Sequence, residues 1–570
     1  QWVHASTPSN TLATLYGLAL DCIERKVLGE EVEIRLHVLD ETINRVRFDR
    51  LIRMVRADGG HGLVALCGVQ TNQYPRAVDI CTRFHTAGIQ TCIGGFHVSG
   101  SVAMLPEARK EVQLQQAMDA GISLFAGEAE GRFDEVIRDA MKGEMQALYN
   151  YVAETPQLEG VPQPFLPAAS AKRTGGGKAT FDAGRGCPFL CSFCTIINVH
   201  GRTSRYRGPD DVEPIIRRNL AQGIKSFLIT DDNFARNRNW EPILDRLIAL
   251  REGEGLPISF SIQVDTVSHK IKGFIEKCGR AGVDRIFLGL ESINPEALKE
   301  ARKGQNNITE YRAVAQAWHS IGAVTNAGYI LGFPGDTPET IARDIEIIKR
   351  ELPLDVLDFF IMTPLPGSQD HKELFEKGVP LDQDLNRYDT FHVTAGHARM
   401  SADAWLDIYR RAWGLYYTPE HVATVMRRAR ARGEPLGHLM VKLFVFFACQ
   451  AIEHVHPLDG GLIRRKYRRD RRPGLPIENP LVFYPRLALE SVRKYSRLLW
   501  IYWRFNRIRR RVENEPDGAS YQDVATTPVT PEELETLEIY HATPAAETAV
   551  IKVQRKRKAP SSAGPNGSAA

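Results

Sequence analysis

Short apolar runs typical of β-strands alternate with helix-length segments through the first 400 residues of this chain. Strands separated by helices predict parallel sheets covered by helices, and such sheets bind ligands at the carboxyl ends of their strands. The alternation is interrupted at residues 151–178, which are rich in Pro, Gly and Ala and which we interpret as a linker. We therefore expect two α/β domains, at residues 1–150 and 179–400.

The first domain is expected to be Rossmann-like, with a flavodoxin-like arrangement of helices around a parallel sheet. The runs that predict its strands are 31–40, 63–70, 90–96 and 122–128. The second domain contains six such runs, which predict a partial (β/α)6 barrel of the TIM type with its chemistry at the loops that follow the strands. Those runs are 179–186, 226–232, 259–265, 285–292, 324–332 and 357–364.

After residue 400 the pattern changes to helices. Residues 401–530 predict a helical, basic C-terminal region, and residues 531–570 have the composition of a largely disordered tail. The chain has 73 Lys and Arg against 69 Asp and Glu, yet residues 460–511 alone hold sixteen basic and three acidic residues. An anionic partner is therefore expected to meet the C-terminal part of the chain.

At 43% hydrophobic and 25% charged residues, the composition is typical of a soluble globular protein and excludes fibrous, collagen-like and wholly disordered classes. Nine cysteines without a secretory signal fit a reducing compartment, so we expect a cytoplasmic protein. The longest apolar stretch, 439–452, is interrupted by Lys442 and Gln450, so we expect no membrane-spanning helix. Because the chain begins with Gln1 and not Met, we also expect that a short N-terminal piece is missing.

Cys187, Cys191 and Cys194 form a C-x3-C-x2-C motif directly after the first expected barrel strand. Three thiolates from one short loop can bind three irons of a [4Fe–4S] cluster and leave the fourth iron open to an outside ligand. A zinc site is one alternative, although structural zinc takes four ligands and the chain has no second paired-cysteine motif. A chance grouping of buried cysteines is the other alternative.

With this motif the chain resembles the radical S-adenosylmethionine (radical SAM) superfamily, in which three such cysteines hold a [4Fe–4S] cluster and SAM binds its fourth iron. The resemblance extends to the ends of the other expected barrel strands, such as residues 228–234, 289–292 and 328–335. It implies that SAM is bound by Phe193, Asp232, Asn233, Gln263, Glu291, Ser292 and Gly332. For each polar residue in this set, the alternative is a strand-end side chain that caps the next helix.

The N-terminal domain resembles the cobalamin-binding domain that precedes the barrel in one branch of this superfamily. The similar segments are residues 66–75, 94–100 and 127–130, each at the end of an expected strand. They imply that cobalamin is bound by Gln70, Thr71, Asn72, Gln73, Gly94, Gly95, His97, Ser99, Gly127 and Glu128. The D-x-H-x-x-G motif with which other cobalamin proteins supply a histidine to cobalt is absent from the sequence, and we do not assign His97 to cobalt. The alternative is a Rossmann-like domain without a ligand.

The resemblance implies that the reduced cluster cleaves SAM to a 5′-deoxyadenosyl radical, which abstracts hydrogen from an unactivated carbon of a small-molecule substrate, and that methylcobalamin then methylates that carbon. The electron would come from an external donor such as a flavodoxin or ferredoxin. No side chain is assigned as catalytic, because the cofactors carry this chemistry. Cyclisation or rearrangement without methyl transfer is an alternative reaction, and a sensor that binds its cofactors without turnover is an alternative function.

Residues 484–511 combine aromatic and aliphatic side chains with clustered Arg at helical spacing. Such a helix is typical of the interface of anionic membranes, which would suit a lipid substrate and a peripheral position at the inner face of the membrane. A helix packed on the barrel with a solvated basic face explains the same pattern. Nucleic-acid binding is a third and less favoured interpretation.

Overall fold

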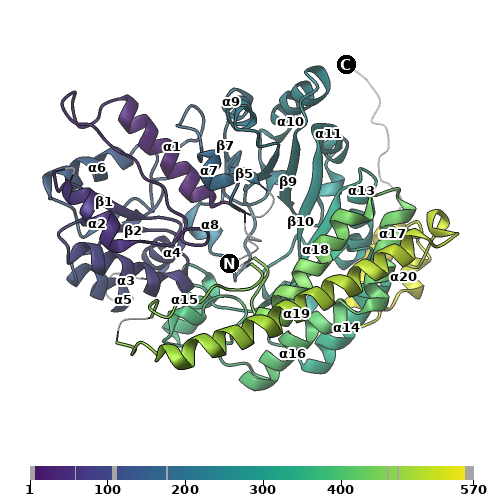
Figure 1. The fold of residues 1–570 in the computed structure, drawn as a ribbon. Coiled ribbons are helices and arrows are strands. Elements are labelled where there is room, and N and C mark those ends of the chain that lie inside the picture. Colours follow the sequence, from purple (N-terminus) through teal and green to yellow (C-terminus); the bar gives the residue numbers. More distant parts are fainter. Residues whose placement is uncertain are drawn as a thin grey trace, which may run out of the picture.

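The computed structural model describes residues 7–57, 59–105, 112–174, 177–458, 461–471 and 474–558. Figure 1 shows the four-stranded sheet of the N-terminal part beside a larger six-stranded sheet, with the C-terminal helices packed along the larger one. Both sheets are parallel throughout. The expected Rossmann-like and partial-barrel architectures are therefore confirmed.

The first sheet has the sequential order β1-β2-β3-β4. Its strands are β1 (Leu63–Leu66), β2 (Gln90–Gly94), β3 (Ser123–Ala126) and β4 (Leu148–Asn150). The helices around it are α2 (Phe48–Ala57), α3 (Tyr74–His85), α4 (Phe96–Met104), α5 (Val112–Asp119) and α6 (Phe133–Lys142). Ile93, Leu124 and Ala126 are fully buried between these layers, as expected for a parallel sheet with covered faces.

The predicted strand at residues 31–40 is wrong. Exposure alternates from residue to residue there, as in an extended segment, but no strand among the described residues pairs with it. Alternating polarity specifies an extended backbone, whereas a strand also needs a neighbour for its hydrogen bonds. The sheet instead gains β4, which the sequence analysis did not identify.

The second sheet has the order β12-β11-β10-β9-β8-β5, and its end strands are not paired with each other, so it is a partial barrel. Its strands are β5 (Lys178–Phe181), β8 (Ser226–Ile229), β9 (Ser259–Val264), β10 (Val283–Glu291), β11 (Val324–Leu331) and β12 (Val356–Ile361). Between and after them come α9 (Pro209–Ala221), α10 (Trp240–Ile248), α11 (Phe274–Ala281), α12 (Pro295–Glu300), α13 (Tyr311–His319), α14 (Pro338–Glu351) and α15 (Gln369–Glu376). All six predicted barrel strands are present, each within a few residues of its expected bounds.

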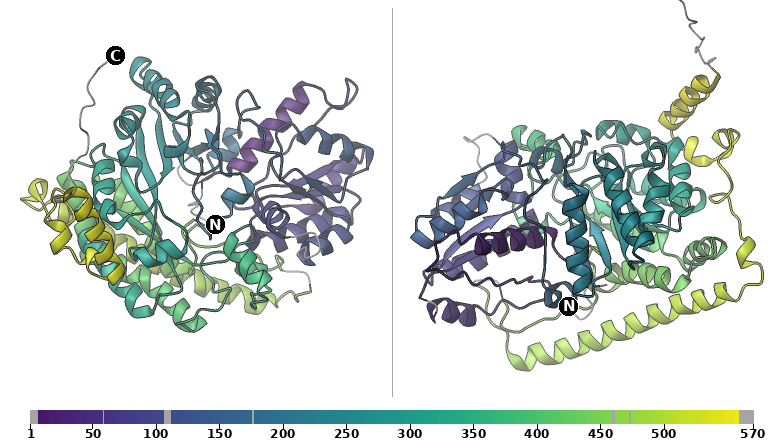
Figure 2. Two further views of the ribbon diagram at one scale, coloured as in Figure 1. Left: turned by 180° about the vertical axis from the view of Figure 1, so that it is seen from behind. Right: turned by 90° about the horizontal axis from the view of Figure 1, so that it is seen from above.

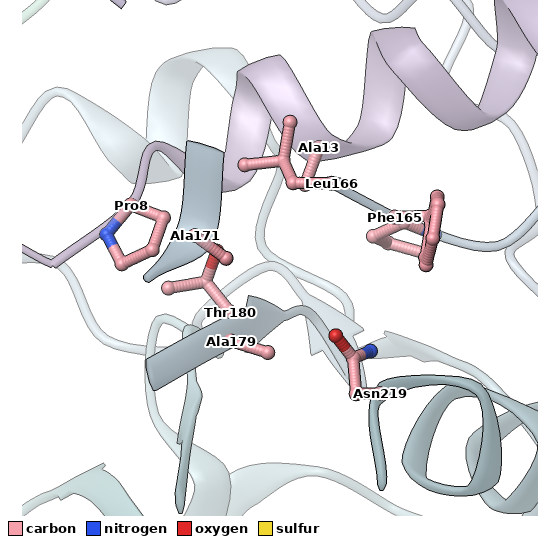
Figure 3. A pocket seen from close by; sticks show the side chains of 9 residues that line it. Pro8, Ala13, Phe165, Leu166, Ala171, Ala179, Thr180 and Asn219 are labelled. Carbon is pink, nitrogen blue, oxygen red and sulfur yellow. The ribbon is translucent and has the colours of Figure 1, made fainter. Parts of the chain in front are cut away.

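The N-terminal helix α1 (Asn10–Glu24) packs against β5 of the second sheet and against α6 of the first domain, so it contacts both domains. A small pocket lies where α1, the short helix α7 (Ala168–Ala171), β5 and α9 meet (Figure 3). Its lining is mostly apolar and includes Ala13, Leu166 and Ala179. None of its lining residues belongs to the candidate cofactor sites, so this pocket does not mark the chemistry.

The C-terminal region begins with α16 (Ala402–Tyr416), α17 (Pro419–Ala431), α18 (Leu436–Ala448) and the long helix α19 (Pro480–Glu513). Figure 2 shows α19 extending as one straight rod along the edge of the molecule. The second half of α19 packs on α17 and α18 through Ile501, Phe505 and Ile508, while most of its first half is exposed.

Among the described residues, Leu436–Glu453 is the one segment long and apolar enough to cross a membrane, and half of it is buried inside the fold. Leu439, Met440 and Leu443 of α18 belong to the main hydrophobic core, and the helix packs against α19 and β12. We therefore interpret α18 as a core helix.

The prediction of a largely disordered tail is wrong for residues 533–558, which form α20 (Glu533–Thr536), a 3-10 turn and α21 (Pro544–Lys558). Leu534, Ile539 and Tyr540 are buried in the main core. Glu351 accepts hydrogen bonds from the N–H groups of Glu538 at 3.1 Å and Ile539 at 2.8 Å. This short apolar cluster is not apparent from the average composition of the tail. Residues 559–570 lie outside the described residues.

Candidate active site

The three motif cysteines lie on one loop, closed by a short antiparallel ribbon of β6 (Gly184–Arg185) and β7 (Arg205–Tyr206). Cys187 N–H donates to Gly201 O at 3.2 Å, and Cys194 N–H donates to Cys191 O at 3.2 Å. Gly186 has φ +93°, and a Cβ there would overlap the backbone of Thr203. The ribbon and this glycine hold the loop after β5, at the carboxyl edge of the barrel.

Burial raises the pKa of the Cys187 thiol to about 11 and of the Cys194 thiol to about 12, and both thiols interact with Cys191. Thiols of this kind are protonated at neutral pH, so metal binding would release their protons. Within the described residues, no three His, Cys, Asp or Glu side chains converge as a single ion would require. A cluster spreads its ligands over three irons, whereas a zinc ion draws all of them to about 2.3 Å. Three neighbouring thiols on one loop therefore fit a cluster.

Asp231 and Asp232 follow β8, and both hold the backbone that leads to the cysteines. The Asp231 carboxylate accepts hydrogen bonds from Ala183 and Gly184 N–H, both at 2.7 Å, and burial raises its pKa to about 7. Asp232 accepts a hydrogen bond from Gly186 N–H at 2.7 Å and lies 3.1 Å from His200 Nδ1. Burial opposes protonation of His200, but Asp232 outweighs it and raises the histidine pKa. The predicted SAM residue Asp232 thus positions the cysteine loop.

Asn233 is almost completely buried and makes one of its possible hydrogen bonds. Its Nδ2 donates to Asp265 Oδ2 at 3.0 Å, while its Oδ1 is buried without a hydrogen-bond partner. The guanidinium of Arg236 fixes Asp265 through bonds of 2.6 and 3.0 Å. An oriented amide with an orphaned acceptor fits a ligand that offers an N–H donor, such as an ammonium group.

Glu291 ends β10 in a left-handed backbone conformation, with φ +63°, beside a β-bulge. Such strain costs on the order of 1–3 kcal/mol and is found preferentially at functional sites. The Glu291 carboxylate is ion-paired with Lys303. Burial opposes the charge on Lys303, but Glu291 and the thiols of Cys191 and Cys194 outweigh it and raise the lysine pKa.

Lys303 and Gln305 also contact the cysteine loop, and the sequence analysis did not identify them. Lys303 Nζ lies 5.6 Å from the ring centre of Phe193, and Gln305 Nε2 donates to Cys191 Sγ at 3.4 Å. Both follow α12 in a loop without a recognisable motif. Only their contacts with the cysteine loop identify them.

The remaining predicted SAM residues have different surroundings. Gln263 lies on β9, in register with Phe287 of β10. Ser292 accepts a hydrogen bond from Asn294 N–H at 3.0 Å, so its hydroxyl orders the turn before α12. Gly332 has φ +110°, and any Cβ there would overlap the ring of Trp405, so packing alone requires glycine.

In the N-terminal domain, the loops after β1 and β2 are bonded to each other. Val69 N–H donates to Gly94 O at 3.1 Å, His97 N–H donates to Val69 O at 3.2 Å, and a Cβ on Gly95 would overlap Val69. Burial lowers the pKa of His97 to about 3, and its ring centre lies 4.3 Å from that of Tyr74. His97 is therefore a neutral, packed imidazole.

Most other predicted cobalamin residues also have structural contacts. Ser99 Oγ accepts a hydrogen bond from Gly127 N–H at 3.0 Å. Thr71 and Asn72 belong to a 3-10 turn, Thr71–Gln73, and Gln73 Oε1 accepts a hydrogen bond from Gln70 N–H at 3.1 Å. These loops lie at the carboxyl edge of the first sheet, where such a fold binds ligands.

The carboxyl edges of the two sheets face each other, which no motif predicted. Arg185, next to the cysteine loop, forms buried ion pairs with Glu128 at 2.5 Å and Glu130 at 2.6 Å. The rings of Phe96 on α4 and His200 have centres 5.1 Å apart. The helix α4 also packs against α8 (Ile196–Val199), which follows the last cysteine (Figure 1). The predicted cobalamin residue Glu128 thus joins the two domains.

Residues 183–348 match the model of the family described as the Radical SAM superfamily. The chain is 26% identical over 326 residues to a bacteriochlorophyllide d C-12(1)-methyltransferase of Chlorobaculum tepidum, covering 55% of this chain and 67% of that protein. It is 26% identical over 345 residues to a hopanoid C-2 methylase of Rhodopseudomonas palustris, covering 60% of this chain and 62% of that protein.

Solved structures share the fold at low sequence identity. The radical S-adenosylmethionine methyltransferase TsrM of Kitasatospora setae, with cobalamin and a [4Fe–4S] cluster bound, has a TM-score of 0.54 at 15% identity, covering 72% of this chain and 86% of that one. The cobalamin-dependent S-adenosylmethionine radical enzyme OxsB, with aqua-cobalamin and S-adenosylmethionine bound, has a TM-score of 0.52 at 15% identity, covering 96% and 82%.

Proposed function

We propose that this chain, whose residues 183–348 match the Radical SAM superfamily, is a cobalamin-dependent enzyme that methylates an unactivated carbon of a small-molecule substrate. The observation that carries the proposal is the meeting of two carboxyl edges. The cysteine loop and the glycine-rich loops of the first sheet face one another across Arg185 and Glu128. A methyl carrier and a radical generator must both reach one substrate carbon, which this arrangement allows.

When bound, the cluster supplies the electron that cleaves SAM reductively, and cobalamin carries the methyl group. In this proposal Cys187, Cys191 and Cys194 hold the three irons. Lys303 offsets the negative charge of the thiolates, and the amide of Gln305 donates to the sulfur of Cys191. Hydrogen bonds to cluster sulfurs tune the reduction potential, so both residues are positioned to make reduction easier.

For SAM we propose that Glu291 and Asn233 bind the methionine end, because a strained carboxylate and an orphaned amide oxygen suit an ammonium group. Phe193 would lie along the adenine, with Gln263, Ser292 and Gly332 lining the remaining wall. Asp232 would act through the loop that it anchors. Together these groups fix the orientation of SAM and exclude water from the bond that is cleaved.

For cobalamin we propose the turn Gln70 to Gln73 and the close-packed loops at Gly94, Gly95 and Gly127. Backbone that carries no side chain accommodates a flat, bulky ligand, and short polar groups can bind its amide arms. His97 would contact the ligand edge or pack beneath it. Ser99 and Glu128 would hold the loops through the hydrogen bond and the ion pair described above.

We further propose that α19 rests on the cytoplasmic surface of an anionic membrane. A stripe of large apolar side chains on this helix is exposed, including Leu481 at 83%, Leu489 at 73% and Leu499 at 67%. Clustered Arg and Lys flank the stripe. In an interfacial helix, apolar side chains enter the lipid and the flanking cations contact the anionic headgroups. The pattern of α19 is of this kind. This position would suit a lipid substrate, and a flavodoxin or ferredoxin would supply the electron from the cytoplasm.

The test is anaerobic reconstitution of the full chain with iron, sulfide and hydroxocobalamin. Because one [4Fe–4S] cluster contains four irons, we expect about four irons per chain, together with bound cobalt. Under a strong reductant, SAM should yield both 5′-deoxyadenosine and S-adenosylhomocysteine. Cys191→Ala should lose the iron and both products, whereas Cys22→Ala, a buried cysteine of α1, should keep them.

Other outcomes point to the alternatives. Deoxyadenosine without S-adenosylhomocysteine or cobalt would contradict methyl transfer and favour cyclisation or rearrangement. An intact cluster without SAM cleavage would contradict the enzyme and favour a sensor.

A further inference from the structure

Three basic side chains gather at the amino end of the barrel strands, opposite the cysteine loop. Lys178 is the first residue of β5, Arg285 lies near the start of β10, and Lys442 lies in the middle of α18. Lys178 Nζ donates to Ser261 Oγ at 3.1 Å, and Ser261 is the register partner of Arg285. Lys442 interacts electrostatically with both other cations.

The three cations lack the acidic partners that other buried cations of this chain have. Arg205 pairs with Glu128, Lys303 with Glu291, and Arg312 with Glu533. Within the described part of the chain, by contrast, none of Lys178, Arg285 and Lys442 forms an ion pair, and Arg285 Nε is buried without a hydrogen-bond partner.

Two acids lie near these cations, and neither neutralises them. Asp284 is exposed at the strand start, and Asp355 is bound to His319 at 2.9 Å and Arg432 at 3.1 Å. Burial lowers the pKa of Lys178 to about 8, and the proximity of Arg285 adds to this effect. Burial and the proximity of the other two groups lower the pKa of Lys442 well below the ordinary lysine value. An anionic ligand would offset this repulsion and stabilise the charged form of all three side chains.

Arg285 faces the same side of the sheet as Gly289 and Glu291. Along β10, Ile286 and Leu288 are fully buried on one face, so Arg285 shares the opposite face with Gly289, and a Cβ on Gly289 would lie 2.8 Å from the Glu291 carboxylate. Glu291 lies six positions after Arg285, which is about 20 Å of strand at about 3.3 Å per residue. On this face a Cβ built on Gly328 would lie 2.9 Å from the ring of Phe287 and 3.4 Å from the ring of Phe360, so both rings lie beside Gly328.

We propose that Lys178, Arg285 and Lys442 bind an anionic oxygen group, a carboxylate or a phosphate, at one end of the substrate. The hydroxyls of Ser226, Ser259 and Ser261 lie at the same end of the strands and can add hydrogen bonds. The substrate is then an elongated amphiphile, with an apolar middle along Phe287 and Phe360 and its reacting carbon near Glu291. This inference rests on the proposed function, because it assumes that the chain acts on a substrate. It deepens that function by giving the chemical class of the substrate.

The experiment uses the full chain as purified and needs no cofactor. The probes are inorganic phosphate and hexanoate, each titrated against sodium chloride of equal ionic strength, with Tm and calorimetric binding as readouts. We expect one probe to raise the Tm progressively, and the probe that does so identifies the group. Arg285→Met should weaken the binding of that probe by about 10- to 100-fold, because a charged hydrogen bond is lost. It should also raise the Tm of the ligand-free protein, because a repulsive charge is removed.

The matched control is Lys225→Met, an exposed lysine directly before β8, which should respond as the wild type does. If Arg285→Met fails to fold, Lys442→Met tests the same site from α18. A wild-type protein that responds to neither probe, or variants that respond as well as the wild type, would overturn the inference. SAM cleavage by the wild-type protein is measured separately, so an anion site without SAM cleavage would contradict only the proposed function.

Discussion

Gly100 on α4 and Gly367, after β12, touch across the two domains. A Cβ on Gly100 would lie 2.8 Å from the Cα of Gly367 and 2.6 Å from the carbonyl oxygen of Pro366. The carbonyl of Gly367 in turn accepts a hydrogen bond from Asn198 of α8 at 2.8 Å. The close approach of two backbones therefore fixes the distance between the first sheet and the cysteine loop.

Gly100→Ala should push the two domains apart. Alanine normally stabilises a helix interior by about 0.5–1 kcal/mol, but here overpacking should dominate and cost about 1–3 kcal/mol. Urea unfolding and cobalamin retention after gel filtration measure the effect. Gly414→Ala in α16, where a Cβ meets no atom within 4 Å, is the control and should be neutral or stabilising. Equal stability of the two variants would contradict a tight interface.

Lys303→Met should impair both folding and SAM binding, because Lys303 holds the carboxylate of Glu291 in place. It leaves the Glu291 carboxylate partly buried without its cation, and breaking a buried pair costs about 3–5 kcal/mol. SAM affinity should therefore fall at least about tenfold, as measured by equilibrium dialysis on the reconstituted protein. Lys299→Met, an exposed lysine of α12, should bind SAM normally. Unchanged affinity in Lys303→Met would show that Glu291 does not hold SAM.

Asp358→Asn should remove a pH-dependent loss of stability. Burial raises the pKa of Asp358 to about 8, so the folded protein keeps a proton that the unfolded chain, with a pKa near 3.9, releases earlier. The contribution of this group is present below about pH 4 and is lost as the pH rises to about 8, by at most about 1.4 kcal/mol per pH unit. The difference in unfolding free energy between variant and wild type should therefore grow from pH 4 to pH 8. Asp284→Asn, at an exposed position of β10, is the control and should show no such trend.

Leu489→Glu should weaken binding to vesicles that contain phosphatidylserine. The substitution places a carboxylate on the exposed stripe of α19, where Leu489 is 73% exposed and makes little contribution to folding. Flotation with liposomes should show at least a several-fold loss, and wild-type binding should decline with added salt. Val529→Glu, at another exposed apolar site, should bind as the wild type does. A wild-type protein that does not bind anionic vesicles at low salt would contradict the membrane proposal.

The local parts of this protein were predictable from sequence. The βα alternation predicted both sheets, and the spacing of Cys187, Cys191 and Cys194 placed them on one loop, because periodicity and short spacing are encoded within a few residues. The same logic failed at residues 31–40, where the alternation was correct but no neighbouring strand accepts the hydrogen bonds. It failed again at Ile539 and Tyr540, whose burial depends on Glu351 and the core far away in sequence.

Only the tertiary structure decided which distant residues meet. Glu291 contacts Lys303, Arg185 contacts Glu128, Gly100 contacts Gly367, and Lys178 donates a hydrogen bond to Ser261. None of these pairs has a sequence signal, because each depends on strand register and on the packing of whole domains. The sequence by itself determined the chemistry that the chain can carry, as thiols on a loop and polar residues at strand ends. The packing determined where that chemistry converges, because only a folded chain can place residues that are far apart in sequence within a hydrogen bond of each other.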